Sequence, residues 1–146
     1  MQGLAEFLTM LCAGLFAGAA VYVSLVEHPA RMECGTPIAV TEFGPSYRRA
    51  ALMQATLAIA GFVFSIIAWL SGAHPLWLLG GTLLVLVVPF TLIVIMPTNR
   101  MLLDPSLDKN SKKAHQLLVR WGQLHAVRAI LGLFAFAFLL LVSPPG

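Results

Sequence analysis

Charged residues are scarce in this sequence. Lys, Arg, Asp and Glu make up 10% of the 146 residues, whereas about 25% is usual in soluble domains. Hydrophobic residues make up 59%. A water-soluble globular protein of this size cannot bury so much apolar surface, so the composition excludes that class. It predicts an integral membrane protein with the lipid bilayer as its main partner and no nucleic-acid partner.

Cysteine is also scarce, and no basic residue stands near the N-terminus. Cys12 and Cys34 are far apart and form no C-x-x-C motif, which argues against a disulfide framework. No Lys or Arg precedes the first apolar run, and this run is longer than the apolar core of a signal peptide. We therefore expect the first run to be a membrane helix and not a cleaved signal.

Four apolar runs are present, at residues 4–26, 50–70, 76–96 and 119–142. Each has about 20 residues or more, which is enough to cross a hydrocarbon layer of ~30 Å. They predict an all-α, up-down-up-down four-helix bundle that forms a single transmembrane domain, 1–146. The expected helices cover approximately residues 4–27, 49–71, 76–97 and 111–142.

The basic residues predict the orientation of this bundle. All nine lie in or beside two loops: Arg31, Arg48 and Arg49 in the first, Arg100, Lys109, Lys112, Lys113 and Arg120 in the second, and Arg128 just inside the last run. With four spans these two loops lie on one side, and the positive-inside rule makes that side cytoplasmic. We expect both termini outside, in a bacterial inner (plasma) membrane.

Prolines predict where the helices end or bend. Pro29 disfavours helical geometry at His28, so the first helix should end there. Residues 31–48, with two glycines and two prolines, are expected to be irregular, with at most a short interfacial helix. Pro89 lies within the third run and lacks an N–H, which predicts a kink.

Small residues in the first run predict close helix packing. Gly14 and Gly18 form a G-x-x-x-G motif, which lets two helices approach closely. Packing within the bundle is the simpler interpretation, and a homo-oligomer or a larger membrane complex is the alternative. Val21, Leu25 and His28 continue the same stripe, so His28 should point into the bundle.

The start of the fourth run carries three chemically distinctive side chains. Trp121, His125 and Arg128 occupy positions i, i+4 and i+7, and Gly132 extends the series. At about 100° per residue, all four lie on one face of a helix. A bare guanidinium at the depth of Arg128 is costly, and an ion pair with Glu27 would relieve this cost.

Most other polar side chains belong to the same end of the bundle. The cytoplasmic ends of the four helices carry Glu27, His28, Arg31, Tyr47, Arg48, Gln54, Asn99, Trp121, His125 and Arg128. The opposite end offers only Glu6, Ser71, His74 and Thr82. This asymmetry predicts a site at the cytoplasmic end.

Three interpretations of this cluster stay open. In the first, it is a catalytic pocket in which His28 or His125 is the general base and Arg128 or Asn99 stabilises an oxyanion. The expected substrate-binding residues are Glu27, Arg31, Tyr47, Gln54 and Trp121. In the second, His28 and His125 bind a copper or iron ion, or haem, although their spacing matches no known metal motif. In the third, the cluster is a hydrogen-bonded plug in a non-catalytic membrane subunit. A cavity among these residues favours the first interpretation.

Four short motifs, taken together and in order, resemble a known family. They are Ser24-Leu-Val-Glu27-His28-Pro29-Ala-Arg31, Tyr47-Arg48-Arg49-Ala50, Pro97-Thr-Asn99-Arg-Met-Leu102 and Trp121-x-x-x-His125-x-x-Arg128. The chain is similar to the anthrone-oxygenase-like family of small four-helix membrane proteins. The resemblance implies that His28, Asn99, Trp121, His125 and Arg128 share one site. It further implies oxygenation of a small aromatic substrate by O2, as anthrones are converted to anthraquinones, without a classical organic cofactor.

Overall fold

The computed structural model describes residues 1–143, and all of its regular secondary structure over this range is helical. The predicted domain, 1–146, includes three further residues that lie outside the described part. Four helical spans are long and apolar enough to cross a membrane: Gln2–Glu33, Thr36–Leu70, Leu76–Leu102 and Lys112–Val142. This agrees with the predicted all-α membrane protein.

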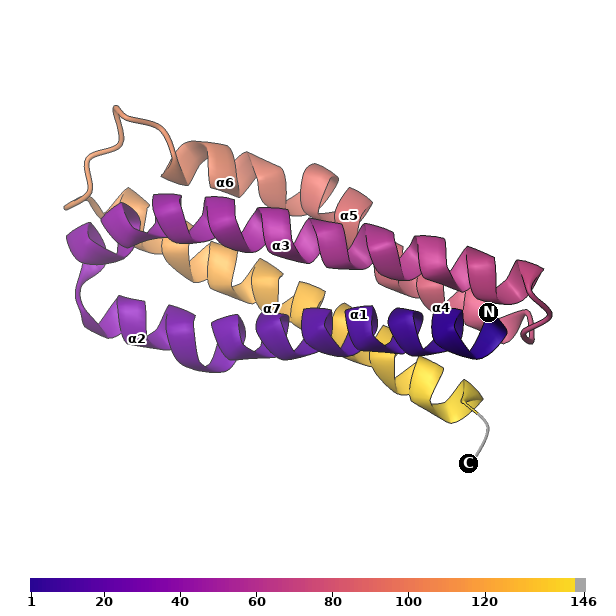
Figure 1. Cartoon of the computed structure of the whole chain (residues 1–146). Coiled ribbons are helices and arrows are strands. Elements are labelled where there is room, and N and C mark those ends of the chain that lie inside the picture. Colours follow the sequence, from indigo (N-terminus) through magenta and orange to yellow (C-terminus); the bar gives the residue numbers. More distant parts are fainter. Residues whose placement is uncertain (144–146) are drawn as a thin grey trace.

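The four spans lie side by side along one axis (Figure 1). The N-terminus, the end of α7 at Val142 and the short connection at residues 71–75 lie at one end of the bundle, which we call the terminal end. The connections at residues 34–35 and 103–111 lie at the other end, which we call the loop end. The side of the membrane that each end faces stays a prediction.

The first span is longer than predicted and does not end at His28. It consists of α1 (Gln2–Tyr22), a π-helical turn η1 (Val23–Glu27) and α2 (His28–Glu33). The N–H of His28 bonds to the carbonyl of Val23, five residues back. Pro29 follows in the first turn of α2, where a missing N–H is tolerated. The expected stop was wrong because the π-turn rearranges the hydrogen bonds in front of the proline.

The third span also contains a π-helical turn followed by a proline. It consists of α4 (Leu76–Val85), α5 (Val87–Phe90), the π-helical turn η2 (Thr91–Ile95) and α6 (Met96–Leu102). Pro97 occupies the first turn of α6, as Pro29 does in α2. The helix is also interrupted at Leu86, close to the kink predicted from Pro89, whose absent N–H leaves a carbonyl of the preceding turn without its bond.

The second span, α3 (Thr36–Leu70), begins about thirteen residues earlier than expected from the apolar run. Gly35 precedes it with a positive φ of 89°, and Pro45 lies inside the helix. The buried residues Ala39, Val40 and Phe43 pack into the core of the loop end. The prediction of an irregular loop over residues 31–48 was wrong. The packing of this segment stabilises the helix enough to offset the loss of the backbone hydrogen bond at Pro45.

The fourth span is a single helix, α7 (Lys112–Val142), capped by Ser111, whose Oγ accepts the N–H of Ala114 at 3.1 Å.

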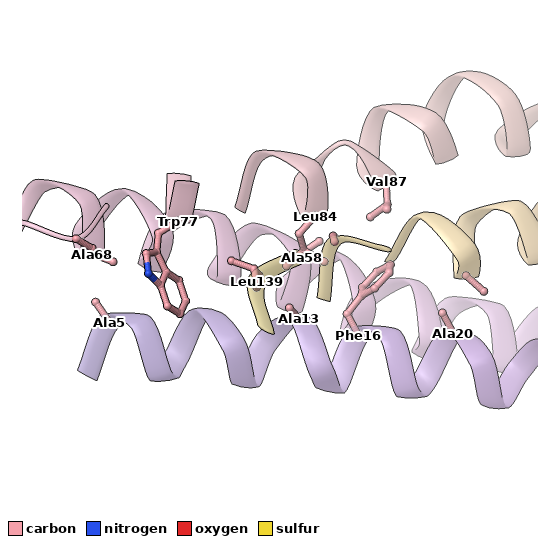
Figure 2. Packing of buried hydrophobic residues seen from close by; sticks show 13 residues of the cluster. Ala5, Ala13, Phe16, Ala20, Ala58, Ala68, Trp77, Leu84, Val87 and Leu139 are labelled. Atoms are coloured by element: carbon pink, nitrogen blue, oxygen red, sulfur yellow. The ribbon is translucent and has the colours of Figure 1, made fainter. Parts of the chain in front are cut away.

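Two hydrophobic clusters hold the bundle together. The cluster toward the terminal end is rich in alanine around Phe16, Trp77, Leu84 and Leu139 (Figure 2). The cluster at the loop end contains larger side chains, among them Phe43, Leu118 and Trp121.

The glycine stripe of the first span faces the bundle only in part. A Cβ at Gly14 would lie 3.2 Å from the Phe136 ring of the fourth span, as close packing predicts, whereas a Cβ at Gly18 would meet no atom within 4 Å and Leu25 is 72% exposed. The π-turn inserts one extra residue, which rotates everything after it by about 100°. His28 is therefore buried, as expected, but for a different reason: η1 turns it inward although Leu25, on the same predicted stripe, faces outward.

Candidate functional site

A cavity of about 150 Å³ lies between the spans toward the loop end. All four spans contribute to its wall, from η1 and α2, the start of α3, α5 to α6, and α7. Its polar lining consists of Glu27, Arg31, Ser46, Tyr47, Thr91, Asn99, Trp121, His125 and Arg128. The remaining lining is aliphatic, apart from Met96. An apolar pocket with a few converging polar groups is typical of a small-molecule site.

The predicted face of α7 forms one wall of this cavity. Trp121, His125 and Arg128 are 5%, 3% and 9% exposed, and all three line the cavity. Gly132, one turn further, lies so close to Phe16 that a Cβ there would be 2.5 Å from the ring. The i, i+4, i+7 spacing in the sequence thus identified the residues that the helix directs inward.

Asn99 lines the cavity and carries a buried hydrogen-bond donor without a partner among the described residues. Its Oδ1 accepts the indole N–H of Trp121 at 2.8 Å. Because indole is only a donor, this bond fixes which end of the amide is oxygen. The Nδ2 atom is buried and has no partner among the described residues. The amide is therefore held at the cavity wall with its NH2 group unpaired among the described residues.

His125 is held by two contacts. Its Nδ1 lies 3.0 Å from the Oγ of Ser24, and its ring stacks on Trp121 with centroids 4.8 Å apart. When Nδ1–H donates to Ser24, Nε2 carries the lone pair. Ser24 was not among the predicted site residues, although it opens the first motif of the sequence. Its contact spans the first and fourth helices, and only the tertiary structure brings the two side chains together.

His28 is close to these residues but does not line the cavity. It is buried against α7, with its ring centroid 5.1 Å from that of Trp121. A Cβ on Gly122 would lie 2.5 Å from the His28 Nε2 atom, so only glycine leaves room for the imidazole there. His28 therefore contacts Trp121 from behind the cavity wall.

Glu27 pairs with Arg31 and not with Arg128, contrary to the predicted ion pair. The two residues are four apart on a helix that continues through Pro29, and this spacing favours such a pair. Arg31 also lies within 2.6 Å of the Glu42 carboxylate. Ser46 donates to Glu27 at 2.6 Å and accepts from Arg31 at 2.9 Å. Ser46, which the sequence did not indicate, completes this network at the cavity wall.

Arg128 lacks an acidic partner. No carboxylate among residues 1–143 lies within ion-pair distance of it, and its Nε is buried without a hydrogen-bond partner in that range. Its guanidinium carbon lies 5.2 Å from the centre of the Phe16 ring. A cation–π contact offsets only part of the cost of burying a charge. Arg128 therefore presents an uncompensated positive charge to the cavity.

The two remaining predicted binding residues differ in position. Tyr47 lines the cavity, stacks on Phe43 and points its hydroxyl at the Met96 sulfur, 3.9 Å away. Gln54 is 1% exposed but does not line the cavity. Its two amide atoms have no partner among the described residues, and the structure gives no physical account of how it is satisfied.

No group of three or more His, Cys, Asp or Glu side chains within residues 1–143 is arranged to hold a metal ion. His28 and His125 do not converge on the cavity, because only His125 lines it. Cys12 and Cys34 are free, one buried and one exposed. A metal ion bound to His28 and His125 would therefore need further ligands other than the His, Cys, Asp and Glu side chains of residues 1–143.

The structure is that of a small helical membrane protein with a cavity lined by Arg128, other polar groups and aliphatic side chains. The sequence matches the family model for anthrone oxygenase over residues 43–138, about two thirds of the chain. The protein therefore belongs to the anthrone oxygenase family. The matched region includes Tyr47, Asn99 and the α7 residues, while Ser24, Glu27, His28 and Arg31 precede it. No curated protein and no solved structure matches the chain.

Proposed function

We propose that this protein is a membrane-embedded oxidoreductase that uses O2 to oxygenate a small, apolar aromatic substrate with an acidic C–H group. Arg128 carries this proposal. A guanidinium buried at the wall of an apolar cavity, without a carboxylate partner within residues 1–143, is arranged to bind an anion that forms inside the cavity. Family membership supports the same chemistry.

The groups around the cavity divide the reaction among them. His125, oriented by Ser24, takes a proton from the substrate carbon through Nε2. The substrate becomes a carbanion whose charge spreads to its oxygen. Arg128 and the Asn99 NH2 group hold that oxygen. Trp121 fixes the Asn99 amide and stacks on His125.

Oxygen then reacts with the electron-rich carbon. A C–O bond forms between the carbanion and O2, and the proton on His125 returns to give a hydroperoxide. Removal of the second proton from the same carbon breaks the O–O bond and leaves a carbonyl group and water. The reaction consumes one O2 per methylene group and needs no further reductant.

The alternative of a hydrogen-bonded plug is less well supported. A plug would fill the space among these side chains, whereas Glu27, Asn99, His125 and Arg128 surround a cavity. No observation within the described residues favours a metal or haem carrier over the enzyme. A partner that packs on the outward face of Gly18 stays a prediction.

The test is O2 uptake by the purified protein in lipid nanodiscs with an anthrone as probe. We expect Arg128→Met to lower kcat by about 10²–10³-fold, as for other oxyanion donors. His125→Gln should lower it by about 10²–10⁴-fold through loss of the base. Arg120→Met and His115→Gln are matched controls on the exposed face of α7. Turnover that survives in both cavity variants would remove these residues from the mechanism.

A further inference from the structure

The cavity extends from its buried polar wall to the lipid-facing surface of the bundle. Asn99, His125 and Arg128 are no more than 9% exposed, whereas Leu92 lines the same cavity and is 57% exposed. Its neighbour Ile93 is 74% exposed. Leu92 lies ten residues before the end of α6, about 15 Å from the loop end of the third span. The opening is therefore at the depth of the acyl chains and not at the water interface.

The opening lies between α3 and the second half of the third span. On the α3 side it is lined by three half-buried alanines, Ala50, Ala51 and Ala55. α4 packs closely along α3 toward the terminal end, whereas α5 and α6 contact α3 only sparsely. The alanines of α3 are small, and α5 and α6 lie apart from α3. A lateral gap is therefore left between these helices.

The size of the cavity limits what it encloses. Its volume is about 150 Å³, similar to that of a dry apolar cavity of about 150 Å³ that binds benzene in another protein. One aromatic ring fits this space. A ligand longer than one ring would extend from this space through the gap beside Leu92.

We propose that the substrate is a single-ring phenol with an apolar tail, taken up sideways from the bilayer. Its reacting C–H group is an unsubstituted ring carbon ortho or para to the hydroxyl, which carries two hydrogens in the keto tautomer. The ring and its hydroxyl occupy the cavity at Arg128, Asn99 and His125. The tail passes between Leu92 and Ala51 into the lipid. This proposal rests on the proposed function, because it assigns the cavity as the substrate site, but it names a smaller aromatic group than an anthrone.

Thiol labelling tests the gap directly. In a Cys34→Ser background, Ala51→Cys places a thiol at the opening, and N-pyrenylmaleimide reaches it from the lipid. Ala60→Cys is the control, since Ala60 is also a half-buried residue of α3 but does not line the cavity. We expect 4-nonylphenol at ten times its Kd to slow labelling at position 51 by about tenfold. Labelling at position 60 should not change.

Three further variants connect this binding to the cavity. Arg128→Met should abolish protection at position 51, because the phenol hydroxyl loses its cationic partner. Ala51→Leu and Ala55→Leu should narrow the gap and weaken binding of 4-nonylphenol by about tenfold, equivalent to 1.4 kcal/mol. They should affect 4-methylphenol, which has almost no tail, much less. Ala60→Leu should leave both affinities unchanged.

The outcomes separate this proposal from the proposed function. Equal protection at positions 51 and 60 would show mere partitioning into lipid and overturn the lateral gap. Turnover of an anthrone without any protection by 4-nonylphenol would overturn the single-ring substrate and leave the oxygenase standing. Protection that depends on Arg128, with no O2 uptake for any probe, would confirm the binding site and refute the oxygenase.

Discussion

The terminal end and the loop end of this bundle use opposite kinds of packing. Toward the terminal end, alanines and glycines bring the helices together, and a Cβ on Gly81 would lie 1.9 Å from the Ser65 hydroxyl. At the loop end, Tyr47, Trp121 and His125 are larger side chains that line a cavity between the helices. Without water to drive association, helices in lipid depend on close packing. The terminal half supplies that packing, which leaves the loop half free to hold an incompletely filled site.

Phe16 lies where the two halves meet, and its loss should have the largest effect. Its ring is fully buried, lies near the Arg128 guanidinium and fills the space beside Gly132. Phe16→Ala should lower the free energy of unfolding by on the order of 2–4 kcal/mol. This is somewhat less than for a phenylalanine in a soluble core, because an unpacked ring in a membrane protein is exposed to lipid and not to water. Thermal unfolding in detergent measures this loss. Phe134→Ala, at a 59% exposed position, is the control, and an equal loss there would contradict the prediction.

Gly81→Ala should affect stability but not catalysis. The added Cβ would lie 2.4 Å from the Ser65 Cβ, a contact that a rotamer change does not relieve. Overpacking of this kind costs about 1–3 kcal/mol, and the melting temperature in detergent should fall accordingly. The fraction that stays folded should take up O2 at the normal rate. Gly18→Ala, which meets no neighbour, should be neutral or stabilise the helix by up to about 1 kcal/mol.

A glycine-to-alanine substitution in the loop half should instead affect catalysis more than stability. In Gly122→Ala the new Cβ forces the His28 imidazole to move, and with it the ring of Trp121. Because Trp121 holds the Asn99 amide, kcat should fall by about 10- to 100-fold through misplacement of the site. The melting temperature should change less than in Gly81→Ala. If Gly81→Ala and Gly122→Ala lose stability and activity to the same extent, the proposed difference between a stabilising terminal half and a catalytic loop half is wrong.

The smallest effect concerns the exposed loop at the loop end. The carboxylate of Asp104 accepts the Ser106 N–H at 2.9 Å and the Ser106 hydroxyl at 2.8 Å. These bonds lower the pKa of Asp104, the backbone bond contributing most. The stabilisation is therefore present above the ordinary carboxyl pKa of about 4 and is lost as pH falls through the lowered value. Ser106→Ala should raise the NMR titration midpoint of Asp104 while O2 uptake stays normal. An unchanged midpoint would show that the hydroxyl bond contributes nothing.

The predictable parts of this protein depend on local patterns. Apolar length identified the four spans, because a bilayer demands about 20 apolar residues per crossing. Helical periodicity identified the inward face of Trp121, His125 and Arg128, since α7 is regular throughout. Periodicity failed for the first span beyond α1, because η1 shifts the register, so that Leu25 is 72% exposed whereas His28 is buried.

The sequence by itself determined the membrane class, the four spans and the residues available at the loop end, because these follow from hydropathy and from spacing along a single helix. Only the tertiary structure decided that Ser24 orients His125 and that Arg128 is left without a carboxylate. Those outcomes depend on how π-turns rotate one helix against another and on which side chains then compete for the same partner. No pattern within one span contains that information.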